Sequence, residues 1–331
     1  MMDKNPFKHM RDMLVAKPVP KVDVKHKVMA AIRAKENKEE KVVKKKIGLL
    51  VTVGMLVGAS SVWAGMELIQ LKNEKGEVVY EVSQHTDQEQ QKMLERLSPE
   101  ERAKLDALKK ESQQRSKIIT DILNGLKPGT TAAIYTVPTK EEEERYKDMI
   151  FVKGKHPNVD VVTKPIEYKG WKEMEPVVGE MFRLPTELEG GLPFDYGVIH
   201  YADSDKYDIE AMKAEAIKDN KKYIVKEIPA SNKFDRASVY YKSQKGNVEV
   251  EVSLLEDDSN GMGTNAQNIE KVMVGENEAV LAIHIFKDGS VSQWISWVKN
   301  GTKLQYMVDA SQEVASKDEL IKIAKQINET K

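Results

Sequence analysis

The sequence predicts an α+β protein in which a single transmembrane helix precedes an extracytoplasmic curved antiparallel sheet with helices packed on one face. Three observations predict this class. Residues 47–66 form an apolar run without a charged side chain. Residues 248–308 alternate apolar and polar positions between glycine turns, as strands with one buried face do. Residues 316–327 then read as a capped amphipathic helix.

Charge is unevenly distributed along the 331 residues, although the formal net charge is only -1. Residues 1–46 contain 14 Lys/Arg and 6 Asp/Glu, whereas residues 67–331 contain 38 and 47. A basic tail next to an acidic remainder is typical of a chain sorted across a membrane. The sequence therefore predicts a basic cytoplasmic tail over residues 1–46.

The run from Ile47 to Met66 has the length of a membrane span, because 20 residues of α-helix cover about 30 Å. Lys44, Lys45 and Lys46 precede it, so we expect a single-pass protein of the cell membrane with a cytoplasmic N-terminus and an extracytoplasmic C-terminal domain. The alternative is a signal peptide cleaved near Ala64, but a leader of 46 residues is far longer than an ordinary n-region.

Within this run, Gly54 and Gly58 form a GxxxG pair. Such a pair lets two membrane helices approach closely, which makes a homodimer through the membrane helix a candidate. Glycine is also common in membrane helices that do not associate, so the pair fits a monomer as well.

The tail carries a short apolar stripe of Val24, Val28 and Ile32 at helical spacing. The stripe could bind a cytoplasmic regulator. It could equally lie beside anionic lipid, helped by the neighbouring lysines. Nucleic acid is not an expected partner, because the tail has no interleaved aromatic residues and no helix-turn-helix pattern.

Residues 67–127 are expected to form a hairpin and a charged helical stalk. Two strands, 67–71 and 77–82, flank the sequence Asn-Glu-Lys-Gly. Ser98-Pro99-Glu100-Glu101 is typical of a helix start, and Gly125 with Pro128 ends that helix. The helix could stand free as a stalk or lie on the sheet that follows.

Residues 128–331 are expected to form the extracytoplasmic α+β domain. Its elements are a helix start at 140–145, a strand at 159–163, loops around 184–193, a helix at 209–218, strands at 248–254, 280–286, 291–298 and 304–308, and a closing helix after Ser316. Asp288-Gly289 and Asn300-Gly301 are expected to form type I′ turns, in which both central residues need positive φ.

Parts of this C-terminal stretch are similar to a known family. Val272-Met273-Val274-Gly275, Ile295-Ser296-Trp297 and the helix Asp318–Ala324 together resemble the domain of unknown function numbered 4367, found in membrane-anchored, anti-sigma-factor-like proteins of Gram-positive bacteria. The resemblance implies a curved sheet with a concave apolar face. The chain lacks the His-x3-Cys-x2-Cys of the zinc-binding anti-sigma type, and no catalytic residue carries over.

The sequence holds no recognisable catalytic, metal or cofactor site. The absence of cysteine excludes disulfides, thiol catalysis and thiolate zinc sites. The six histidines lack ligand spacing, and Ser296 with Lys299 has the SxxK spacing of serine acyl enzymes but sits on an expected strand. We expect no metal, no cofactor and no enzymatic activity.

Trp294, Trp297 and Tyr306 are the candidate ligand-binding residues, which could line a concavity or belong to the core. The expected function is non-enzymatic regulation or signalling, in which the outer domain senses and the tail transmits. The alternative is a membrane-tethered carrier that binds lipid, peptide or lipoprotein. A sensor needs a partner for the tail, whereas a tethered carrier does not.

Overall fold

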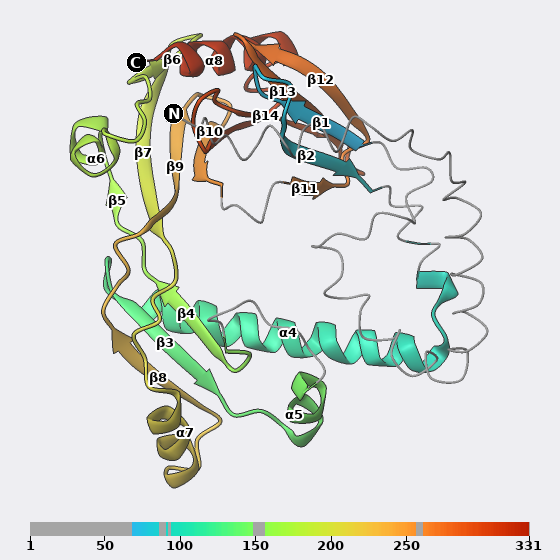
Figure 1. Ribbon diagram of the computed structural model, residues 1–331, viewed down its shortest axis with the longest axis vertical. Helices are drawn as coiled ribbons and strands as arrows, with labels where there is room; N and C mark the ends of the chain where they lie inside the picture. Colours follow the sequence, from blue (N-terminus) through green and yellow to red (C-terminus); the bar gives the residue numbers. More distant parts are fainter. Residues whose placement is uncertain (1–67, 86–90, 92–93, 148–155, 256–260, 331) are drawn as a thin grey trace, which may run out of the picture. The chain divides into compact units, whose positions relative to one another are not determined.

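The computed structural model describes residues 68–85, 91, 94–147, 156–255 and 261–330. All of them belong to the second of two compact units, Gly58–Lys331. These residues form an α+β fold with three sheets, in which nearly all strand pairs are antiparallel (Figure 1). The α+β class predicted from the sequence is therefore confirmed.

The main sheet has nine strands in the order β12-β13-β14-β15-β10-β9-β7-β5, with β6 paired to β7. Its strands are β5 (Glu167–Tyr168), β6 (Glu187–Leu188), β7 (Leu192–Tyr201), β9 (Phe234–Lys242), β10 (Asn247–Leu254), β12 (Asn268–Val274), β13 (Asn277–Ile285), β14 (Val291–Val298) and β15 (Leu304–Ser311).

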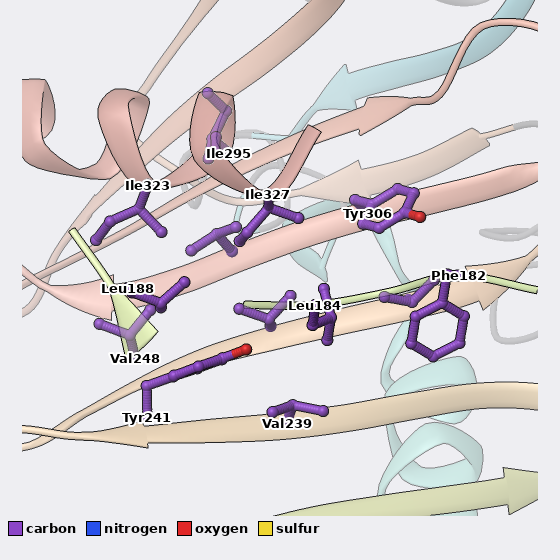
Figure 2. Packing of buried hydrophobic residues seen from close by; sticks show 14 of the residues in the cluster. Phe182, Leu184, Leu188, Val239, Tyr241, Val248, Ile295, Tyr306, Ile323 and Ile327 are labelled. Atoms are coloured by element: carbon purple, nitrogen blue, oxygen red, sulfur yellow. The ribbon is translucent and has the colours of Figure 1, made fainter. Parts of the chain in front are cut away.

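One face of the main sheet is covered by two helices, α6 (Trp171–Val178) and α8 (Lys317–Glu329). Alternate residues of the strands point to this face, among them Val248, Ile295 and Tyr306, and they form one apolar cluster with Ile323 and other inward residues of α8 (Figure 2). Helix α8 begins with the predicted capping box, in which Ser316 and Glu319 bond each other's backbone.

The opposite face of the main sheet is covered at β13 and β14 by a three-stranded sheet in the order β1-β2-β11. Its strands are β1 (Leu68–Lys72), β2 (Val78–Gln84) and β11 (Gly261–Thr264). Strands β1 and β2 form the predicted hairpin, but β2 also pairs in parallel with β11, 180 residues along the chain. The hairpin is thus part of the same folded unit as the C-terminal strands.

A third sheet has the order β4-β3-β8, with β3 (Thr131–Thr136), β4 (Val159–Thr163) and β8 (Tyr223–Ile228). Helix α7 (Ile209–Lys218) packs on it through Met212 and Ala216. The short helix α5 (Lys140–Lys147) follows β3 and begins at the helix start predicted at 140–145.

Helix α4 (Pro99–Gly125) begins at the predicted helix start, where Ser98 and Glu101 form a capping box. It contacts β4, because the Arg115 guanidinium bonds the Asp160 carboxylate at 2.6 Å and the Pro157 carbonyl at 2.9 Å. Helix α4 therefore contacts the following sheet through the side chain of Arg115.

The turn prediction was wrong in its type. Gly289 and Gly301 have φ of +84° and +74°, but neither Asp288 nor Asn300 has a positive φ. At the first turn, the Phe286 amide donates to the Ser290 carbonyl and the Gly289 amide donates to the Phe286 carbonyl. These two bonds enclose a three-residue loop, the pattern of a type I turn followed by a glycine bulge. At the second, one positive φ at Gly301 is the signature of a type II turn.

The loops expected around 184–193 were only partly correct, because strand β7 begins at Leu192. This strand was not predicted because it contains Pro193 and Gly197, and both residue types are depleted in strands. Gly197 is needed there, because a Cβ at this position would lie 2.6 Å from the Met174 sulfur of α6.

Candidate functional site

The predicted ligand-binding aromatics do not share a surface. Trp297 and Tyr306 face each other across β14 and β15, stack at 5.3 Å, and are 0% and 2% exposed beneath the helices. Trp294 points to the opposite face and belongs to the cluster under the β1–β2 hairpin. Positions three apart on a strand face opposite sides, so Trp294 and Trp297 are separated by the sheet itself. All three are core residues.

The predicted tail and membrane positions lie outside the described residues. They are Val24, Val28 and Ile32 of the tail, and Gly54 and Gly58 within the run 47–66. Within the described part of the chain, no helix is both long enough and apolar enough to cross a membrane.

The strongest candidate for a binding surface is a polar area on the hairpin-covered side of the main sheet. The strand register places Asp309 opposite Glu249, Glu249 opposite Tyr240, and Tyr240 opposite Tyr196. Glu251 lies one step further along β10 on the same face. We call these five half-buried residues the acidic–tyrosine face.

The acidic–tyrosine face concentrates carboxylates that are partly removed from water. Burial raises the pKa of Asp309, and the charge of Glu249 raises it further. Burial likewise raises the pKa of Glu251, while Arg236, with its Nε 3.8 Å from the carboxylate, acts in the opposite direction. Carboxylates with raised pKa values are stabilised by any group that donates a hydrogen bond or a positive charge to them.

The tyrosines of this face are ordered by the strands. The Tyr240 hydroxyl donates a hydrogen bond of 3.0 Å to the Glu249 carboxylate. Burial, and to a smaller extent the charge of Glu249, raise the pKa of Tyr240 to about 12. Its ring stacks on Tyr196 at 4.4 Å with an interplanar angle of 18°. The Lys169 ammonium lies 5.4 Å from the centroid of the Tyr196 ring, within the range of a cation–π contact.

The acidic–tyrosine face can accept hydrogen bonds and positive charge, and its aromatic edge can stack on a flat or cationic group. Within the described residues, no group of three His, Asp or Glu side chains is arranged to hold a metal ion.

The SxxK pair has no catalytic arrangement. Ser296 is 0% exposed, and its hydroxyl accepts a hydrogen bond of 2.9 Å from Gln305. Lys299 follows the end of β14, three positions on, where side chains of an extended chain point to opposite sides.

The sequence pattern predicts part of the acidic–tyrosine face. Glu249 and Glu251 alternate with buried valines, which predicted a strand with one wet face. The partners Asp309, Tyr240 and Tyr196 come from three other strands, and their placement depends on pairings that the local pattern does not contain.

No protein-family model, curated protein or solved structure matches this chain. The resemblance to the domain of unknown function numbered 4367 therefore stays a hypothesis.

Proposed function

We propose that this is a single-pass membrane protein with a cytoplasmic N-terminus and a non-enzymatic, sensor-like domain outside the membrane. The observation that carries the proposal is the uncharged run from Ile47 to Met66 directly after three lysines. A charge-free stretch of about 20 residues is rare in soluble proteins and sufficient for a membrane span. The lysines favour the cytoplasmic side.

The domain beyond the membrane would be a curved antiparallel sheet with helices on one face, and the acidic–tyrosine face would be its ligand surface. A ligand with hydrogen-bond donors or positive charge would relieve the repulsion between Asp309 and Glu249, which lie directly opposite each other. A lipid carrier would instead need an open apolar concavity, whereas Trp297 and Tyr306 are buried. This contrast favours sensing over lipid transport.

The cytoplasmic tail would pass the signal to a regulator through Val24, Val28 and Ile32, as the resemblance to anti-sigma-factor-like proteins implies. A stripe of about two helical turns is too short to be stable alone in water, since isolated helices shorter than about 12–15 residues are marginal. The stripe therefore needs a protein partner or a lipid surface.

The full chain, cross-linked in native membranes through residues 22–36, tests whether a partner exists. We expect a specific protein to co-purify with the unchanged chain and to be lost in Val28→Asp, which places a charge on the apolar stripe. Ala30→Asp is the matched control, because position 30 lies about 200° around a helix from position 28. It should keep the partner. Recovery of no partner would contradict signalling and favour the tethered carrier.

A further inference from the structure

Three large apolar side chains are exposed near one end of the described fold. Leu68 begins β1 and is 53% exposed, Ile285 ends β13 and is 49% exposed, and Phe286 opens the turn to β14 and is 53% exposed. Exposed apolar side chains at one end of a fold are candidates for an interaction surface.

A chain of contacts connects Leu68 to the Ile285–Phe286 turn. Leu68 pairs with Ser83 across the hairpin. The next residue, Gln84, donates its side-chain amide to the Gln267 carbonyl at 3.0 Å. The Gln267 side chain in turn accepts the Ile285 amide at 2.7 Å. The start of β1 and the β13–β14 turn therefore lie at the same end of the packed sheets.

The other end of β1 lies at the other end of β13. The Lys72 amide donates a hydrogen bond of 2.6 Å to the Glu278 carboxylate, and Glu278 pairs with Met273 on β12. Strand β1 thus runs along β13 from the end with Ile285 to the end with Glu278. This orientation gives the fold one end close to Leu68 and one end away from it.

Leu68 follows the last residue of the uncharged run by two positions. Two residues of extended chain reach at most about 7 Å. The headgroup layer of each leaflet is about 5–7.5 Å thick, because the bilayer measures about 40–45 Å with its headgroups and about 30 Å without them. If the run spans the membrane, Leu68 and the end of the fold beside it are at the headgroup layer.

The β13–β14 turn holds its apolar residues in place. The Phe286 amide bonds the Ser290 carbonyl at 2.9 Å, and the Asp288 carboxylate accepts both the amide and the hydroxyl of Ser290. Lys287 is exposed beside Phe286. An aromatic side chain with an adjacent lysine suits an interface with anionic headgroups.

We propose that this end of the domain rests on the outer leaflet, with Leu68, Ile285 and Phe286 in the headgroup region. The contact fixes the orientation of the domain relative to the membrane and leaves the end with Met273 and Glu278 pointing away from it. This inference rests on the proposed membrane anchoring, and the lipid interface is chosen as the occupant because the uncharged run ends beside Leu68.

The natural absence of cysteine allows a direct test, because one introduced cysteine can carry one environment-sensitive fluorophore. The full chain with Phe286→Cys is labelled and reconstituted in vesicles of phosphatidylcholine and phosphatidylglycerol, with and without lipids that carry a nitroxide quencher near the headgroup. Met273→Cys is the matched control, because Met273 is also 49% exposed but lies at the far end of the sheet. Equal melting temperatures of the two labelled chains show that both retain the fold.

We expect the label at position 286 to be blue-shifted and quenched at least threefold more than the label at position 273. Equal quenching at both positions overturns the inference, as does cross-linking between position-286 cysteines of two unlabelled copies when the labelled chain shows no quenching. Alkaline carbonate extraction of the same vesicles separates the two proposals. If the chain stays in the bilayer but the label is not quenched, only the contact is wrong; if the chain is extracted, the anchoring proposal fails and the contact fails with it.

Discussion

The indole of Trp294 donates a hydrogen bond of 3.2 Å to Nε2 of His284 on the neighbouring strand. This contact requires an unprotonated Nε2, so His284 is neutral with its proton on Nδ1. Burial lowers the pKa of His284 below the ordinary value of 6.5. Protonation would remove the acceptor that holds Trp294 beneath the β1–β2 hairpin.

Stability is predicted to fall on acidification through this pair. Because the pKa of His284 is lower in the folded chain, the unfolded chain binds the proton first as the pH drops below about 6.5. His284→Gln keeps an acceptor for Trp294 but does not titrate. Urea unfolding of the full chain in detergent measures the free energy of unfolding at pH 7.5 and pH 5.5. Between these two pH values it should fall less for the variant than for the unchanged chain. Equal losses would contradict the role of His284.

Asp309→Asn is predicted to stabilise the fold at pH 7. It removes a half-buried charge directly opposite Glu249, and like charges at such positions destabilise by about 0.2–1 kcal/mol. Because the pKa of Asp309 is higher in the folded chain, the gain should shrink as the pH falls toward 3.8. Urea unfolding of the variant and the unchanged chain between pH 7 and pH 3.8 measures this gain in the free energy of unfolding.

Asp288→Asn is predicted to have the opposite effect on stability at pH 7 from Asp309→Asn. Hydrogen bonds from Ser290 lower the pKa of Asp288, so the ionised carboxylate favours the fold above its ordinary pKa of 3.8. This variant should lose stability at pH 7. A gain for both variants, or a loss for both, would show that the surroundings of the two carboxylates do not differ as described.

The second glycine turn can be tested by two substitutions. Gly301 has φ of +74° and open space around a hypothetical Cβ, so Gly301→Ala should cost about 1–2 kcal/mol through backbone strain alone. Asn300 has no positive φ, so Asn300→Ala should change the unfolding free energy by less than about 0.5 kcal/mol. Similar losses for both would instead support a type I′ turn.

Because α8 packs one face on the main sheet, alanine substitutions at neighbouring positions of α8 should differ strongly in their effect on the free energy of unfolding. Ile323 is 1% exposed in the main core, and Ile323→Ala should destabilise by about 2–5 kcal/mol. Lys322 is exposed, and Lys322→Ala should stay within about 0.5 kcal/mol. Chemical denaturation followed by tryptophan fluorescence measures both, and a small effect of Ile323→Ala would contradict the docking of α8 on the sheet.

Local patterns predicted the elements whose sequence carries its own signal. The alternation at residues 248–254, the capping box at Ser316 and the helix from Ile209 to Lys218 all correspond to observed elements. Strand β7 was not predicted, because it contains Pro193 and Gly197, two residue types that are depleted in strands. The pairing of β2 with β11 was not predicted either, because it joins segments about 180 residues apart. The acidic–tyrosine face depends on the same long-range register, which brings Asp309 to Glu249.

We propose that residues 47–66 cross the membrane and that the domain after them lies outside. Single cysteines at Val28 and at Ile217, which is 69% exposed, test it with a membrane-impermeant maleimide on intact protoplasts. We expect labelling at position 217 in intact cells, labelling at position 28 only after permeabilisation, and an intact mass that includes residue 1. Labelling at position 28 in intact cells, protection of position 217, or a mature N-terminus near Gly65 would contradict it.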